Sequence, residues 1–218
     1  MRPVSKELYT DNSETYTPYG KAKEDLFKAI GNFCSYCERE GFFSSLAVEH
    51  IHDKNNNPEL ENEWSNFLLA CNNCNSIKGT KDVNFDEVFF PHLENTFRIF
   101  EYLEGGLIVV DKGLSNVEKN KVKELVELVG LLRRPGVIGY SSKDLRWRER
   151  LAAWNLAKKY LNKLERNECD EESILDIALA KGFWSVWMTV FKGKQSVQKL
   201  FIQSFKGTNS SFFEDLLV

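Results

Sequence analysis

Two of the three histidines in this 218-residue chain lie one residue apart, in the segment AVEHIHDK at residues 47–54. His50 follows Glu49, and His52 precedes Asp53. Such side chains can bind a metal ion, and a neutral imidazole can act as a general base because its pKa is about 6.5. In a regular strand, residues 50 and 52 would share one face and residue 49 would point to the other. The segment alone therefore allows metal ligands, a catalytic base with a helper, or polar residues on a strand edge.

Four of the five cysteines form two Cys-x-x-Cys pairs, Cys34 with Cys37 and Cys71 with Cys74. The N-terminus lacks the apolar core of a signal peptide, so we expect a cytoplasmic protein, in which disulfides are rare. Two such pairs can surround one Zn²⁺ as a tetrahedron and leave no open position for a substrate. We therefore predict a structural zinc site, and we expect chemistry to come from other residues. Cys169 stands alone and is expected to be an inert thiol.

The composition is that of an ordinary globular protein, with 42% hydrophobic and 28% charged residues. The formal net charge of -3 argues against nucleic-acid binding through bulk charge, although not against a local basic groove. No apolar stretch approaches the roughly 18 residues of a membrane span, so no membrane association is expected. The chain has no Walker motif, so any dependence on ATP would come through a partner.

The hydrophobic pattern predicts the elements that must position the candidate residues. Residues 21–31 indicate a helix that ends at Gly31, and residues 44–51 indicate a short strand. Residues 52–63 are polar and typical of a loop. Residues 64–80 carry an apolar run into the second cysteine pair and then into a helix.

The pattern changes after about residue 95. Residues 96–113 predict a β-hairpin around Gly105 and Gly106, and Ser115 or Asn116 is a candidate helix cap. Helices are predicted over residues 115–132, 141–167, 172–182 and 196–205. We therefore expect an α+β protein with a first domain at residues 1–95 and a mainly helical second domain at residues 96–218.

The pattern C-x-x-C … E-H-I … W-x-N-F-L-L-A-C-x-x-C-N-x-x-K-G, over roughly residues 30–80, resembles the HNH endonucleases and their ββα-metal fold. The resemblance implies that His50 is the general base and that Asn66 holds the histidine-bearing loop. It also implies that Glu49 and Asn75 are ligands of a catalytic Mg²⁺ or Mn²⁺. These ligands would need the strand to end or twist sharply near His50, since alternation sends residue 49 to the opposite face.

The chain departs from the HNH pattern at three places. Glu49 replaces the aspartate of many relatives, and Asn75 takes the position of the final histidine. His52 and Asp53 stand where relatives often have an apolar residue and proline. His52 is therefore either a supporting residue that contacts metal or phosphate, or a solvated loop histidine. Asp53 is either an ordinary loop acid or a metal ligand.

The N-terminal RPV, the CSYCE knuckle and the helical second half are similar to a narrower branch, the PtuB nuclease subunits of Septu-type and retron-linked antiphage systems. This resemblance implies a PtuA-like ATPase as partner and a nucleic acid as substrate. HNH chemistry needs no 2′-hydroxyl, which favours DNA. The alternatives are an effector that cleaves RNA or tRNA, and a zinc-knuckle binding module without catalysis.

Three basic residues are candidates for nucleic-acid contacts. Lys78 follows the second knuckle, where it could contact phosphate or lie on the surface. Arg146 and Arg150 belong to the strongest basic excess in the chain and could line a nucleic-acid path, or lie on a solvated helix face.

Other aromatic and histidine positions are expected to be structural. His92 is interpreted as a structural histidine. The aromatic segment 182–191 and the apolar tail 210–218 are either core or a subunit interface, because aromatic residues are enriched in interfaces.

Overall fold

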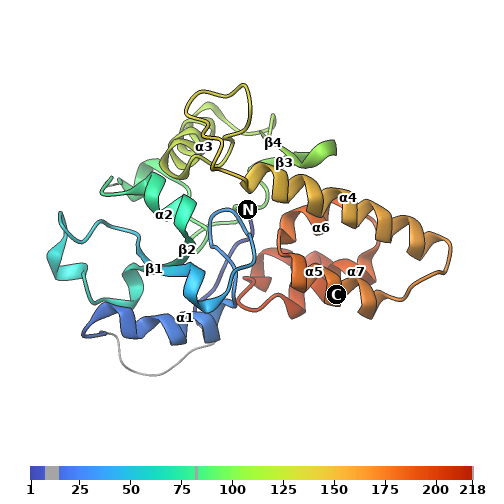
Figure 1. The fold of residues 1–218 in the computed structure, drawn as a ribbon, viewed down its shortest axis with the longest axis horizontal. Helices are drawn as coiled ribbons and strands as arrows, with labels where there is room; N and C mark the ends of the chain where they lie inside the picture. The colour runs from blue at the N-terminus through green and yellow to red at the C-terminus, as the bar shows by residue number, and fades with distance from the viewer. Residues whose placement is uncertain (8–14, 82, 218) are drawn as a thin grey trace.

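A two-stranded antiparallel hairpin lies between two helices in the first part of the chain (Figure 1). The computed structural model describes residues 1–7, 15–81 and 83–217. Strand β1 (Leu46–His50) pairs with β2 (Phe67–Cys71), and helices α1 (Ala22–Ile30) and α2 (Asn72–Lys78) both pack against the pair. This order of two strands and a helix, with the cysteines around it, confirms the predicted ββα arrangement.

A second hairpin follows, formed by β3 (Phe100–Leu103) and β4 (Leu107–Val110). Its turn contains Gly105 and Gly106, as the sequence predicted, and the structure places both residues at positive φ. At Gly106 a Cβ atom would lie 2.8 Å from the backbone of Arg150, so this position needs glycine for a second reason. The turn and the helix that carries Arg150 therefore pack backbone to backbone.

The second half of the chain is mainly helical, which confirms the predicted fold class. Ser115 and Glu118 form a capping box at the start of α3, so Ser115 is the cap. The helices are α3 (Asn116–Val129), α4 (Arg146–Glu165), α5 (Glu171–Lys181), α6 (Trp184–Val190), α7 (Gln195–Ser204) and α8 (Glu214–Leu217).

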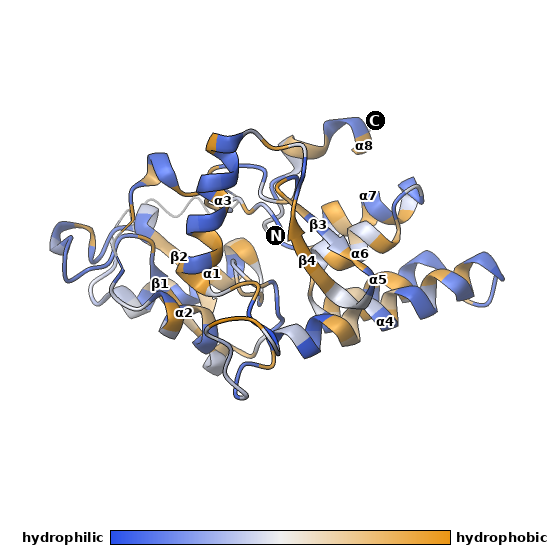
Figure 2. Ribbon diagram, turned by 90° about the horizontal axis from the view of Figure 1, so that it is seen from above, coloured by the Kyte–Doolittle hydropathy of each residue, from blue (hydrophilic) through white to orange (hydrophobic). Residues whose placement is uncertain are grey.

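The aromatic segment 182–191 forms α6 and lies in the core. Trp184, Trp187 and Phe191 are fully buried, and the Trp187 and Phe191 rings stack with centroids 6.1 Å apart. Of the two readings of this segment, core and subunit interface, the structure favours core. Figure 2 shows hydrophobic residues along β4, where the β3–β4 hairpin meets the helices of the second half. It also shows hydrophilic residues at the far end of α4.

Buried polar contacts join the chain on the two sides of residue 95. The Arg2 guanidinium donates to the carbonyls of Phe205 and Lys206, and Tyr102 donates to the Glu38 carboxylate over 3.0 Å. The Glu38 carboxylate also accepts from the backbone N–H of Ser185 over 2.7 Å. The boundary at residue 95 stays a prediction. Among the described helices, none has both the length and the apolar character required to cross a bilayer.

Candidate active site

The four paired cysteines converge on one point in the interior. Their sulfur atoms all lie within 4.8 Å of one another, and the sulfurs of Cys37 and Cys71 are 3.6 Å apart. A Zn²⁺ with four thiolates at about 2.3 Å would set its sulfurs about 3.8 Å apart. The donor set and its spacing therefore fit a closed, tetrahedral zinc site, as the sequence predicted.

Arg146 forms a second layer around this site. Its Nη1 donates to the Cys74 sulfur over 3.0 Å and to the carbonyl of Val129 over 2.9 Å, and its Nη2 forms a 2.6 Å ion pair with Asp144. Four thiolates around Zn²⁺ carry a net charge of -2, which a buried guanidinium offsets. Arg146 therefore belongs to the zinc site.

The expectation that Arg146 and Arg150 line a nucleic-acid path is corrected by this burial. Both side chains are only 2% exposed, and Arg150 donates to the carbonyl of Gly106 over 2.6 Å. A phosphate could not reach either guanidinium without displacing packed backbone. The basic excess of α4 includes these two interior cations, whereas Arg148, Lys158 and Lys159 are exposed.

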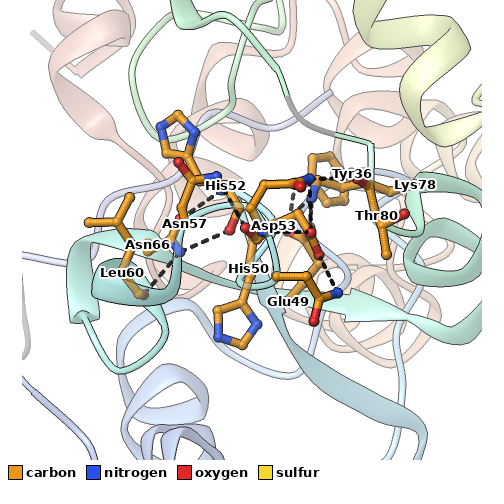
Figure 3. Close-up of polar contacts among 12 residues, drawn as sticks. Tyr36, Glu49, His50, His52, Asp53, Asn57, Leu60, Asn66, Lys78 and Thr80 are labelled. Carbon is orange, nitrogen blue, oxygen red and sulfur yellow. Dashed lines mark hydrogen bonds and ion pairs between the residues drawn. The ribbon is translucent and has the colours of Figure 1, made fainter.

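Glu49 and Lys78 form a buried ion pair (Figure 3). The Nζ atom of Lys78 lies 2.8 Å from Oε1 of Glu49 and 2.7 Å from the backbone oxygen of His50. The Tyr36 hydroxyl donates to Oε2 of Glu49 over 2.7 Å. Lys78 is 2% exposed, so it is neither a surface lysine nor placed to contact phosphate. Tyr36 was not predicted as a site residue. The signal that could have indicated it is its position between Cys34 and Cys37 in the segment CSYC.

This environment does not fit Glu49 as a ligand of a hydrated cation. Mg²⁺ normally keeps several waters, so its carboxylate ligands need access to solvent. Glu49 is 2% exposed, and the Lys78 ammonium already occupies the position of a cation beside it. Burial raises the pKa of Glu49, although the charge and hydrogen bond of Lys78 oppose that rise. Asn75, the other predicted ligand, lies on α2 and is partly exposed.

His50 lies on the opposite side of β1 from this pair. Its ring is half-buried, with edge contacts to Tyr19 and Phe67 at centroid distances of 4.6 and 5.2 Å. Its Nε2 lies 2.8 Å from the backbone oxygen of Glu61. A carbonyl can only accept, so Nε2 carries the proton and Nδ1 carries the free electron pair. The atom able to accept a proton is therefore Nδ1.

The surroundings of His50 keep its ring neutral. Burial lowers the pKa of His50 below its ordinary 6.5, and the positive charges of Lys54 and Lys78 lower it further. The hydrogen bond to Glu61 and the charge of its carboxylate oppose this shift without reversing it. A neutral imidazole is the form that a general base requires.

Asn66 fixes the chain that leaves β1. Its Oδ1 accepts from the backbone N–H of His52 over 2.7 Å, and its Nδ2 donates to the carbonyls of His52 and Leu60 over 3.0 and 3.1 Å. These bonds turn the chain immediately after His50, where β1 ends. This is the geometry that the predicted role of Asn66, holding the histidine-bearing loop, requires.

The two neighbouring histidines consequently point apart, as Figure 3 shows. The His52 ring lies 4.2 Å from the ring of Phe85, and the His50 ring lies against Tyr19. Strand alternation would have set them on one face, and the turn at residue 51 prevents this. In this arrangement His52 does not share a site with His50, and a supporting role for it stays a prediction.

The remaining candidates have structural surroundings. Asp53 is 7% exposed and accepts from the backbone and side chain of Asn56, as an ordinary loop acid does. His92 packs against Phe90, and burial lowers its pKa to about 3. The Cys169 sulfur lies 3.8 Å from the carbonyl of Tyr160.

Comparison with known proteins assigns the segment that contains these residues. Residues 34–81 match the sequence model of the HNH endonuclease family. This segment is an HNH domain. The HNH domain thus spans both knuckles, β1, β2 and α2, together with His50, Glu49 and Asn66.

A curated relative extends the similarity beyond the HNH domain. The Septu protein PtuB of Bacillus thuringiensis is 32% identical to this chain over 127 residues, which cover 56% of the chain and 48% of the relative. The chain therefore spans about half the length of the curated relative that it matches.

Replacing Cys71 with serine should release zinc and unfold the HNH domain, because the closed site loses a thiolate and Arg146 loses the charge that it offsets. Zinc content by atomic absorption and thermal unfolding check this. Cys169→Ser, outside the cluster, is the matched control and should keep the wild-type zinc content and melting temperature. A stable, zinc-free Cys71→Ser protein would contradict the structural role of the metal.

Proposed function

We propose that this protein is an endonuclease that hydrolyses phosphodiester bonds of nucleic acids, with DNA as the favoured substrate and His50 as the general base. The observation that carries the proposal is the half-buried, neutral His50 ring at the end of β1 in an HNH domain, with its Nε2 held by Glu61. A zinc-knuckle binding module would need the cysteines but not this histidine.

The chemistry follows from the free atom of the ring. Nδ1 of His50 accepts a proton from water, and the water oxygen attacks phosphorus as the bond to the leaving sugar oxygen breaks. The leaving oxygen is then protonated from solvent. The Mg²⁺ or Mn²⁺ implied by the family resemblance would stabilise charge on the phosphoryl group, but the burial of Glu49 and its ion pair with Lys78 do not favour Glu49 as its ligand. The chain's own contribution is the oriented base.

The biological setting is proposed from the similarity to a Septu protein. In that setting the chain is the nuclease subunit of an antiphage system and works with an ATPase partner. The absence of a Walker motif in the sequence agrees with ATP acting through another subunit. RNA, including tRNA, is the alternative substrate class, and incubation of the protein with DNA and with total RNA distinguishes the two.

We propose that the nucleic-acid backbone lies in a groove between α2 and the segment before α4. A cavity of about 320 Å³ there is lined by Asn72, Asn73, Arg133 and Lys143. A neighbouring cavity of about 500 Å³ shares Asn72 and Asn73 and adds Lys181. This groove replaces Arg146 and Arg150 as the candidate contact surface.

The charges of the groove favour an anionic ligand. Its acids are already engaged, Asp144 with Arg146, Glu149 with Arg39 and Glu40 with the amide of Asn32. By contrast, Arg133, Lys143 and Lys181 form no ion pair within the described residues. Cations of this kind can neutralise phosphates in a protein whose overall charge is negative.

Replacing His50 with alanine should lower cleavage by at least about 10²-fold, because general-base catalysis contributes about that much or more. Purified protein, alone and with the co-expressed neighbouring subunit, is incubated with DNA and with total RNA in Mg²⁺ or Mn²⁺. Zinc content and melting temperature of the variant should stay at the wild-type values. Undiminished cleavage by His50→Ala would remove His50 as the base, and a wild type that cuts neither substrate in any condition would favour the binding module.

The acid limb of the pH–rate profile should lie below pH 6.5, the ordinary value for histidine. The neutral ring is the active form, and burial lowers its pKa, so activity should be lost only as the pH falls through that lowered value. The charged groups facing the ring are Lys54, Lys78 and Glu61. Measurement of kcat/KM from pH 5 to 8 checks this, and an acid limb above 6.5 would contradict it.

The double variant Arg133→Ala/Lys143→Ala should weaken nucleic-acid binding and flatten its salt dependence. Each lost contact to a duplex phosphate reduces the slope of log K against log salt by about 0.9. Binding is measured in the His50→Ala background, so that the substrate stays intact. Lys119→Ala/Lys192→Ala removes the same charge from exposed sites on other elements and should leave the slope unchanged. Equal effects of the two double variants would show that only net charge matters.

A further inference from the structure

Lys78 is among the largest fully buried side chains of the protein, which is unusual for a lysine. An ammonium group in the interior is costly unless it is paired and hydrogen-bonded. Lys78 meets both conditions, with the Glu49 carboxylate at 2.8 Å and the His50 carbonyl at 2.7 Å. One of its two partners is thus the backbone of the proposed base.

His50 is held at two separate points by these contacts. Lys78 holds its backbone oxygen from the α2 side of β1, and Glu61 holds its ring nitrogen on the other side. His50 is the last residue of β1, where it pairs with Phe67, and the Ile51 N–H still donates to the Asn66 carbonyl over 2.9 Å. The bond from Lys78 therefore adds a hold on the His50 carbonyl at the point where β1 ends.

We propose that Lys78 is a positioning residue for His50, and that Glu49 is its charge partner and not a ligand of the catalytic cation. This inference rests on the proposed function of His50. Lys78 touches no reacting atom, because the His50 ring lies on the opposite face of β1. Glu49 keeps the ammonium in the interior, where it can reach the carbonyl.

Tyr36 connects this pair to the zinc knuckle. Its hydroxyl donates to the second oxygen of Glu49, and it lies between Cys34 and Cys37 in the sequence. The chain of contacts therefore runs from the zinc knuckle through Tyr36, Glu49 and Lys78 to the backbone of His50. Loss of the pair should change the orientation of His50 without removing a zinc ligand.

A double variant separates positioning from stability. Lys78→Met alone leaves a buried carboxylate unpaired and should unfold at a lower temperature. Lys78→Met/Glu49→Leu replaces the pair by apolar groups of similar size, an exchange that is often neutral or stabilising. We expect the double variant to keep its zinc and to melt above Lys78→Met, although the Tyr36 hydroxyl loses its acceptor, and to lose at least about tenfold in kcat, with KM unchanged. A wild-type kcat in the folded double variant would overturn the positioning role.

Glu49→Gln tests the second half of the inference. The concentration of Mg²⁺ or Mn²⁺ that gives half-maximal cleavage should be the same as in wild type, since the carboxylate does not bind the cation. An increase of about tenfold or more would overturn the assignment and make Glu49 a ligand.

A readout independent of cleavage keeps this inference distinct from the proposed function. In ¹⁵N-histidine NMR spectra, wild-type His50 should show the tautomer protonated at Nε2, and the double variant should show a mixture of tautomers. Retention of the single tautomer in the double variant would overturn the positioning role even if no substrate were ever found. A wild type with the single tautomer that cuts no nucleic acid would refute the proposed function alone.

Discussion

The four thiolates of the zinc knuckle are the constraint on which the other interactions depend. They come from two points of the chain, one just after α1 and one at the junction of β2 and α2, so a shared metal fixes both around the hairpin. Their net negative charge in the interior requires a cation, and Arg146 brings the start of α4 to Cys74. The same guanidinium also donates to the carbonyls of Val129 and Gly130 at the end of α3. One metal site therefore organises elements from both halves of the chain.

The structure keeps its stabilising charges and its chemical group on opposite faces of one strand. Glu49 and Lys78 lie in the interior beside Tyr36, and the His50 ring lies on the side of Tyr19. A charge pair in low dielectric is rigid, because movement of either partner leaves an uncompensated charge. Such a pair is a poor cation site but a firm support, and its bond to the His50 carbonyl transmits that rigidity to a group that needs orientation.

Sequence reasoning succeeded where spacing alone determines geometry. The two Cys-x-x-Cys pairs, the Gly105-Gly106 turn and the Ser115 cap were each predicted from a few adjacent residues. It failed where the partner is backbone from a distant segment. In the sequence, Arg146 and Arg150 resemble surface cations. In the structure they donate to the backbone carbonyls of Val129 and Gly106, and the side chains at those two positions do not indicate such bonds. Likewise, the turn after His50 depends on Asn66, which bonds to His52 from 14 residues away, and α6 has no polar face that would reveal its period.

The short helix α2 connects the proposed groove to the strand that carries the proposed base. Asn72 and Asn73 in its first turn line both cavities, and Lys78 at its end bonds to His50. At 1.5 Å per residue, six residues of helix span about 9 Å. A nucleic-acid strand held by Arg133 and Lys143, as proposed, would lie on the α2 side of β1, so it would have to pass around the end of β1 to reach the His50 ring on the other face. In a chain with net charge -3, the proposed binding of nucleic acid would come from such local placement of cations, because the overall field repels phosphate.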